Sequence, residues 1–268
     1  MQLRFWGVRG SVPTPVARNL GYGGNTSCVE IRLAGGARLI FDAGTGIREL
    51  GLSLEQNPAE DFHIFFTHFH WDHIQGLPFF GPLYNPVCQT TFYSTCYACP
   101  LREALSDQMI GPYFPVPFDA ISNNKKFVTM GGEPVTLGRA TIRPFPLNHP
   151  QGAGGYRIES GDASIVYATD REHGHKELDS VLREYAENAD ILIHDAQYTP
   201  EEYPRFKGWG HSTWQEAVSV ARECNVKQLI LFHHDPNHDD SAVSAIVEDA
   251  RAQFPNTLAA CEGWVGSI

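Results

Sequence analysis

The segment THFHWDH, residues 67–73, constrains this chain more than any other stretch of its sequence. It continues an apolar run, residues 62–67, that predicts a buried β-strand. His68 and His70 are two residues apart and point the same way in an extended segment, so they can bind one ion. Asp72 and His73 lie beyond the turn and can reach a second ion nearby. Imidazole and carboxylate groups favour zinc, with manganese or iron as alternatives.

Residue types that bind metals or carry protons also follow the other apolar runs. These residues are Asp42, His149, Asp170, the pair His194-Asp195 and the pair His233-His234. Functional sites in layered α/β proteins gather at the ends of strands, where loops vary while the sheet stays rigid. We therefore expect these side chains to meet at one edge of a sheet.

Short apolar runs alternate with amphipathic segments, a pattern typical of α/β proteins. The expected strands are 2–6, 27–33, 37–42, 62–67, 90–94, 139–147, 155–159, 163–169, 190–194 and 228–232. The expected helices are 46–56, 100–110, 175–187, 213–224 and 241–253, and Ser212 with Gln215 predicts a capping box for the fourth. No linker divides the chain, so we expect one domain over 1–268. Residues 78–124, rich in proline, glycine and aromatics, predict an irregular excursion from it.

The composition disfavours several classes of protein. The 20 basic and 31 acidic residues give a net charge of −11, so a long nucleic acid is a poor partner. A small anionic substrate remains compatible, because bound cations reverse the local field. We expect a cytoplasmic protein without membrane contact, because no apolar run is long enough to span a bilayer and the start lacks a signal sequence. Cys96 and Cys99 form one CxxC without a second, which favours reduced buried thiols.

The segment THFHWDH resembles the THxHxDH signature of the metallo-β-lactamase superfamily, and the likeness continues along nearly the whole chain. It implies an α/β fold, a four-layer αββα sandwich with a dinuclear metal site at the sheet edge. By this resemblance one ion would bind His68, His70, His149 and Asp170. The other would bind Asp72, His73, Asp170 and His233, with His234 as the alternative last ligand. Asp42, in FDAGTG, resembles a DxG motif whose carboxylate supports the metal loop.

Two further segments resemble the ribonuclease Z-like phosphodiesterase branch of that superfamily. Residues 209–213, WGHST, resemble its [AG]HST motif, and residues 193–196, IHDA, resemble its HEAT-type motif with aspartate in place of glutamate. The resemblance implies that Asp195 orients His211, which protonates the leaving alkoxide as general acid. A metal-bridging hydroxide would attack phosphorus, with Asp72 orienting the water besides ligating. The alternative is that His211 is a buried structural residue.

The substrate expectation depends on an interval in the chain. Ribonuclease Z carries a long tRNA-binding arm between the positions that match His149 and Asp170, whereas here only residues 150–169 lie between them. This disfavours tRNA. The segments FWGVRGS, YGGNTSCVEI and LFHHDP resemble small bacterial proteins near the cyclic-nucleotide phosphodiesterases, which implies a small phosphodiester such as a 3',5'-cyclic nucleotide. Arg9 and His234 are candidate substrate contacts.

Two other functions stay open. One is an acyl hydrolase with the same metals, such as a lactonase, thioesterase or β-lactamase-like enzyme. The other is a non-catalytic metal-binding sensor. The aromatic residues of 79–118 favour a homodimer.

Overall fold

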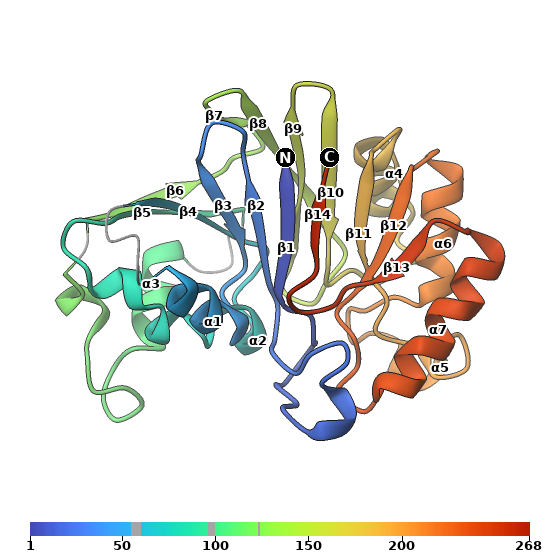
Figure 1. The fold of residues 1–268 in the computed structure, drawn as a ribbon, viewed down its shortest axis with the longest axis horizontal. Coiled ribbons are helices and arrows are strands. Elements are labelled where there is room, and N and C mark those ends of the chain that lie inside the picture. The colour runs from blue at the N-terminus through green and yellow to red at the C-terminus, as the bar shows by residue number, and fades with distance from the viewer. Residues whose placement is uncertain (55–59, 96–99, 123) are drawn as a thin grey trace.

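Two seven-stranded sheets pack face to face, and helices cover their outer faces (Figure 1). The computed structural model describes residues 1–54, 60–95, 100–122 and 124–268. The strand order is β14-β1-β2-β3-β4-β5-β6 in the first sheet and β13-β12-β11-β10-β9-β8-β7 in the second. The predicted αββα sandwich is therefore confirmed. Cys96 and Cys99 lie outside the described residues.

The bounds of the elements are as follows. The first sheet contains β1 (Gln2–Gly7), β2 (Cys28–Arg32), β3 (Arg38–Phe41), β4 (Asp61–Phe66), β5 (Gln89–Ser94), β6 (Asn124–Thr129) and β14 (Val265–Ser267). The second contains β7 (Val135–Leu137), β8 (Ala140–Leu147), β9 (Ala153–Ser160), β10 (Ala163–Ala168), β11 (Ile191–Asp195), β12 (Gln228–Phe232) and β13 (Thr257–Ala259). The α-helices are α1 (Gly46–Ser53), α2 (Trp71–Ile74), α3 (Leu101–Asp107), α4 (Lys176–Ala186), α5 (Tyr203–Phe206), α6 (Trp214–Glu223) and α7 (Asp240–Gln253). Short 3-10 turns lie at Ala17–Asn19, Leu77–Phe79, Gly81–Tyr84 and Phe118–Ala120.

The central strands are apolar on both faces, which explains why their sequences are nearly continuous apolar runs. In β4, Phe62, Ile64 and Phe66 pack against the helices outside the first sheet. Phe65 faces the other way and packs between the two sheets. Residues from both ends of the chain share this central core, which favours the expectation of one domain over 1–268. That expectation stays a prediction.

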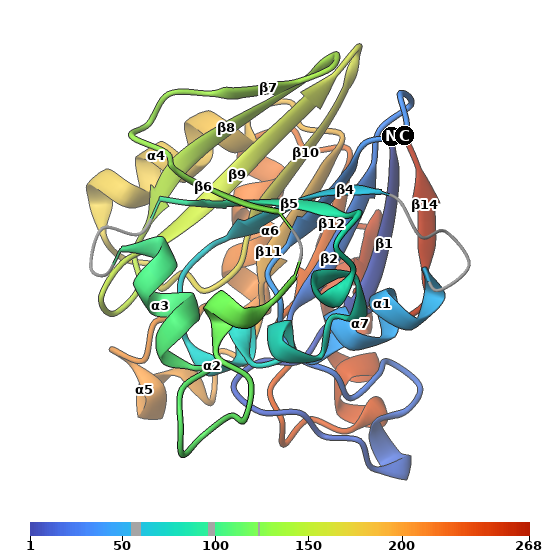
Figure 2. The same cartoon turned by 90° about the vertical axis from the view of Figure 1, so that its left-hand side faces the viewer.

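Parallel strands direct both sheets toward one functional edge. β3, β4, β5 and β6 run parallel to one another, and so do β10, β11, β12 and β13. The carboxyl ends of parallel strands meet at the same edge of a sheet. The helix α2, shortly after β4, lies at the lower edge of the sandwich in both Figure 1 and Figure 2. The termini meet at the opposite edge, where the Met1 amino group donates to the carbonyl of Ile268 over 2.8 Å.

Two details differ from the sequence-based expectations, namely four unpredicted strands and the cap of one helix. The strands β6, β7, β13 and β14 were not predicted, because edge strands are partly exposed and their apolar pattern is weak. The excursion expected at 78–124 contains the predicted β5 and α3 and the start of β6, and its irregular character stays a prediction. The cap of α6 is Thr213, whose side chain accepts from the Glu216 N–H over 3.2 Å. The capping box predicted at Ser212 is therefore wrong, and the Ser212 hydroxyl donates to the Arg171 carbonyl instead.

The helices of the described residues give no sign of a membrane span. None of them is both long enough and apolar enough to cross a bilayer.

Candidate metal centre

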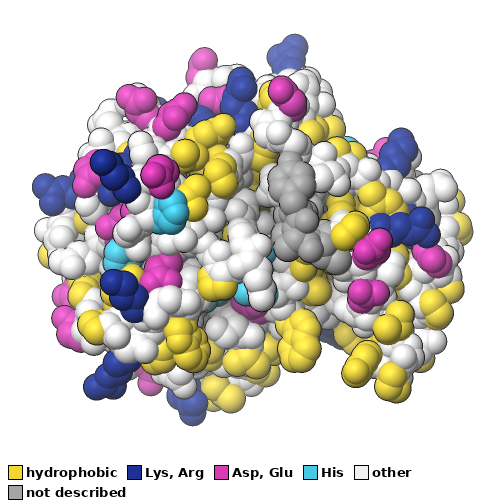
Figure 3. Space-filling view, turned by 180° about the vertical axis from the view of Figure 1, so that it is seen from behind, with side chains coloured by type: hydrophobic (Ala, Val, Ile, Leu, Met, Phe, Trp, Pro, Cys, Tyr) yellow, Lys and Arg dark blue, Asp and Glu magenta, His cyan; other side chains and the backbone are white. Residues whose placement is uncertain are grey.

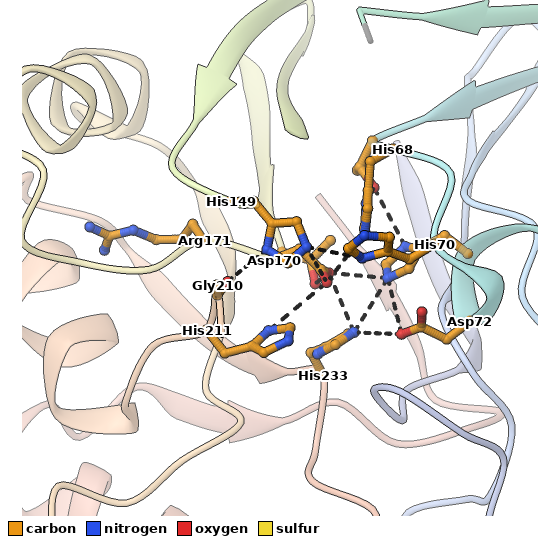
Figure 4. A network of polar contacts seen from close by, with 12 residues as sticks. His68, His70, Asp72, His149, Asp170, Arg171, Gly210, His211 and His233 are labelled. Atoms are coloured by element: carbon orange, nitrogen blue, oxygen red, sulfur yellow. Dashed lines mark hydrogen bonds and ion pairs between the residues drawn. The ribbon is translucent and has the colours of Figure 1, made fainter. Parts of the chain in front are cut away.

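Three residues that follow strands have a left-handed backbone, which side chains other than glycine seldom adopt. The φ angles are 61° at Asp42 after β3, 53° at Asp170 after β10, and 63° at His233 after β12. Such strained positions cluster at functional sites and persist where the surrounding contacts hold them. Here they turn the chain out of the strand, and Asp170 and His233 face each other across the edge (Figure 4).

One group of side chains has the spacing of a tetrahedral metal site. The group consists of Asp72, His73, Asp170 and His233. His73 Nε2 lies 3.3 Å from Asp72 Oδ2 and 3.1 Å from Asp170 Oδ2. His233 Nε2 lies 3.2 Å from Asp72 Oδ2, 3.3 Å from Asp170 Oδ2 and 3.3 Å from His73 Nε2. A zinc ion with bonds of about 2.0–2.1 Å separates tetrahedral ligands by about 3.4 Å. These donors therefore fit one such ion.

A second group lies beside the first and consists of His68, His70 and His149. His149 Nε2 is 3.1 Å from His70 Nδ1. The other carboxylate oxygen of Asp170, Oδ1, lies 3.7 Å from His68 Nε2 and 4.0 Å from His149 Nε2. The buried His68 Nε2 has no hydrogen-bond partner, as expected of an atom whose partner is a metal ion. Asp170 thus presents one oxygen to each group (Figure 4).

The second ring nitrogen of each clustered histidine is paired with an oxygen. Three of these contacts are His73 Nδ1 to Asp42 Oδ2 at 2.9 Å, His149 Nδ1 to the Gly210 carbonyl at 2.9 Å, and His233 Nδ1 to Gln197 Oε1 at 2.9 Å. The other two are His68 Nδ1 to Thr67 Oγ1 at 3.0 Å and His70 Nε2 to Gln151 Oε1 at 3.1 Å. An oxygen that accepts the N–H of one nitrogen leaves the lone pair of the other facing the cluster, the arrangement that metal-binding histidines usually have.

Burial also sets the charge of two of these rings, those of His68 and His149. It places the pKa of His68 well below its ordinary value, and it lowers the pKa of His149 to about 4. Both rings are therefore neutral near pH 7, which a metal ligand requires. Burial alone would raise the pKa of Asp170, but the neighbouring His233, His73 and His68 outweigh it and hold that pKa well below its usual range.

Asp195 and His211 form a pair at the margin of the cluster. His211 Nδ1 lies 2.8 Å from Asp195 Oδ2 and 3.9 Å from Asp170 Oδ1. Burial would lower the pKa of His211, but the charge of Asp195 and this hydrogen bond outweigh it and raise the pKa to about 9. Asp195 also accepts the backbone N–H groups of Asp170, Gln197 and Ser212 at 3.1, 3.2 and 2.9 Å. The pair can therefore hold a proton beside the cluster in a fixed orientation.

The family model described as a beta-lactamase superfamily domain matches residues 37–234, about three quarters of the chain. This chain belongs to that superfamily. The match extends from β3 to the residue after His233 and so contains every candidate ligand.

Known proteins agree with the superfamily assignment. Ribonuclease Z of Thermoplasma acidophilum is 26% identical over 96% of this chain and 93% of its own length. Ribonuclease Z of Archaeoglobus fulgidus is 28% identical over 97% of this chain and 95% of its own length. The metallo-β-lactamase fold protein YhfI of Bacillus subtilis has a TM-score of 0.74 at 19% identity, covering 99% of this chain and 98% of its own. The chain is thus a metal-dependent hydrolase of this superfamily, and the fold implies divalent ions at the cluster.

Two predicted substrate contacts do not reach the cluster. The Arg9 guanidinium is fully buried and donates to the carbonyls of Gly23 at 2.7 Å and His238 at 2.5 Å. His234 is also buried, and its Nε2 lies 3.0 Å from the Ala260 carbonyl. Both side chains hold loops together, so the expectation that either meets substrate is wrong. The structure brings His233, and not His234, into the cluster.

Three residues that support the site carry no signal in the sequence. Gln197 Oε1 accepts a hydrogen bond from His233 Nδ1. The Ser11 N–H donates to Asp72 Oδ2 over 2.7 Å, so the β1–β2 loop fixes a candidate ligand. Glu172 accepts from the N–H groups of Gly208 at 2.7 Å and Gly210 at 2.9 Å. Since the Gly210 carbonyl faces His149, Glu172 fixes the loop that positions that ring.

The backbone of Gly210 lies so close to the His149 ring that no side chain fits between them. Its φ is +90°, and an added Cβ would come within 2.2 Å of His149 Nδ1. Only glycine therefore lets this backbone lie against the imidazole.

Gln197 gives a direct test of the first group, to which His233 belongs. Gln197→Leu removes the oxygen that faces His233 Nδ1, so we expect one of two ions to bind roughly 10–100-fold more weakly, as loss of such supporting contacts usually produces. The measurement is competition between the protein and a zinc indicator. Gln228→Leu is the matched control, because Gln228 begins β12 and bonds Asn256 away from the site. Equal weakening in both variants would contradict the assignment.

Proposed function

We propose that this hydrolase is a phosphodiesterase that acts on a small phosphodiester such as a 3',5'-cyclic nucleotide. The observation that carries the proposal is the Asp195–His211 pair, joined at 2.8 Å beside the His/Asp cluster. An alkoxide is a poor leaving group, so cleavage of its phosphoester requires a proton donor near the departing oxygen. In this proposal His211 donates that proton, and the contact with Asp195 supports it by holding the ring.

The candidate ligands form two sets, one for each ion, according to the distances between their donor atoms. His68, His70 and His149 with Asp170 Oδ1 would hold one, and Asp72, His73 and His233 with Asp170 Oδ2 the other. Bound divalent ions lower the pKa of water and neutralise charge on phosphoryl oxygens. Nitrogen and carboxylate donors at this spacing favour zinc, with manganese or iron as alternatives. Asp72 would also orient the attacking water. Asp42 supports the cluster through its contact with His73.

The chain between His149 and Asp170 supports a small substrate. A tight turn and the hairpin of β9 and β10 occupy this interval, and the two strands pair from Ala163–Ser160 to Tyr167–Tyr156. No residues remain there for an arm that could hold tRNA. The curated relatives are named ribonuclease Z, so a tRNA precursor is the alternative phosphodiester that a test has to include. The predicted homodimer stays a prediction.

One panel of substrates separates the candidate functions. Metal-loaded protein would be assayed on bis-p-nitrophenyl phosphate, 3',5'-cyclic mononucleotides, a tRNA precursor with a 3' trailer, a lactone and nitrocefin. We expect hydrolysis of the small phosphodiesters. Hydrolysis confined to the lactone or nitrocefin would establish an acyl hydrolase instead. Preference for the tRNA precursor would overturn the proposal that the substrate is small, and the proposed phosphodiesterase activity would stand. Metal analysis showing fewer than one ion per chain, with no hydrolysis, would favour a binding or sensor protein.

A further inference from the structure

A mostly apolar pocket of about 410 Å³ lies between the end of the β8–β9 hairpin and the ends of β5 and β6. Its apolar walls include Met130, Phe145, Leu147 and Ala153, and its polar groups include Thr95 and Gln151. No charged side chain occurs among the described residues that line it. The volume falls in the range of small-molecule sites, roughly 300–1,000 Å³. Such walls suit a neutral organic group, and they would leave a second phosphate without a counter-charge.

Gln151 connects this pocket to the candidate metal centre. It lines the pocket, and its Oε1 lies 3.1 Å from Nε2 of His70. The turn that carries it is tight, since the Gly152 N–H donates to the His149 carbonyl over 2.9 Å. The pocket is therefore one side chain away from the cluster. His70, which Gln151 contacts, and His211 lie on different sides of that cluster (Figure 4).

Backbone hydrogen bonds and one aromatic contact with α4 hold the pocket walls in place. The Met130 N–H donates to the Ser94 carbonyl over 2.9 Å, and the Gly154 N–H donates to the Thr67 carbonyl over 2.8 Å. Phe145 stacks on Tyr185 with ring centroids 4.5 Å apart. Walls held in this way need little ordering when a ligand binds, which favours affinity. In the view from behind, histidine atoms are visible near the centre of the face, with hydrophobic side chains on both sides (Figure 3).

We propose that this pocket binds the neutral, ring-bearing part of the substrate, such as a nucleobase, while the phosphodiester lies at the His/Asp cluster. The apolar walls pack against the faces of the ring, and Thr95 and Gln151 offer hydrogen bonds to its polar edge. This inference rests on the proposed phosphodiesterase function and names the part of the substrate that the pocket selects. The pocket then discriminates between phosphodiesters by the size of their organic group.

A pair of substrates with one leaving group tests this selection. Bis-p-nitrophenyl phosphate and methyl p-nitrophenyl phosphate both release p-nitrophenolate and differ in the retained group, which is aryl in one and methyl in the other. Pro146→Trp narrows the pocket from an exposed position. We expect it to lower kcat/KM for the diaryl ester about tenfold relative to the methyl ester, as steric changes in such pockets do.

Two further variants make this result decisive. Ala153→Leu narrows the pocket from another wall and should change the same ratio, which guards against a folding defect in the first variant. Leu52→Trp, at an exposed position on α1, should leave the ratio unchanged. An unchanged ratio in both pocket variants would overturn the proposal.

A binding measurement separates the pocket from the proposed function. N-phenyl-1-naphthylamine, a neutral aromatic fluorophore without phosphate, should bind the metal-loaded protein and be displaced by adenosine. Both pocket variants should weaken its binding about tenfold. If neither phosphodiester is hydrolysed, the proposed function fails and this measurement alone decides the pocket. Equal binding to wild type and to both variants would then contradict it.

Discussion

The Asp170→Asn variant should fold but lose both metal ions and nearly all hydrolytic activity. Asp170 presents Oδ2 to His73 at 3.1 Å and Oδ1 to His68 at 3.7 Å, so it faces both groups. An amide has one neutral oxygen in place of two charged ones, and it cannot neutralise two cations. We expect a loss well beyond the roughly 100-fold that removal of a supporting contact produces. The measurements are metal content per chain and kcat/KM on bis-p-nitrophenyl phosphate.

Asparagine is the substitution of choice because the φ of Asp170 is 53°. Asparagine adopts this left-handed conformation more readily than other residues, so the backbone stays unstrained. Asp162→Asn removes the same charge from the exposed turn between β9 and β10 and serves as the control. It should keep both ions and full activity. An Asp170→Asn protein that retained two ions per chain would refute the bridging assignment.

The activity lost in the His211→Ala variant should depend on the leaving group of the substrate. In the proposed function His211 protonates a departing alkoxide, whereas p-nitrophenolate departs without a proton. We expect kcat/KM to fall about 10²–10⁴-fold on a 3',5'-cyclic nucleotide, the usual contribution of a general acid, and to change little on bis-p-nitrophenyl phosphate. Metal content should stay as in the wild type. Equal losses on both substrates, or loss of an ion, would indicate a ligand or a structural residue instead.

Asp195→Asn tests whether the pair acts as a unit. Asp195 also accepts the backbone N–H groups of Asp170 and Ser212, so its replacement alone changes more than the proton donor. Comparison in both backgrounds separates these effects. In the His211→Ala background, Asp195→Asn should add little loss on the cyclic nucleotide, because residues that act together are not additive. If the loss in the double variant equalled the product of the two single losses, the two residues would act independently.

The sequence determined the fold class and the residue types of the candidate site. A strand buried on both faces needs a continuous apolar run, and the residue that ends such a run is visible in the sequence. Hence the predicted strands of both sheet centres, from β1 to β5 and from β8 to β12, are confirmed. The strands β6, β7, β13 and β14 lie at or near sheet edges, where one face is exposed and the pattern is lost.

Only the tertiary structure decided which neighbours face the site. His233 and His234 are equivalent in sequence, but a left-handed φ of 63° at His233 turns the first toward the cluster, and the second pairs with Ala260. Arg9 looked available to a phosphate, yet it is buried among carbonyl groups. The support from Ser11 comes from a backbone N–H, which every residue except proline has. Such contacts depend on which distant segments meet, so local pattern carries no trace of them, whereas ligand type and strand alternation are local and can be read directly.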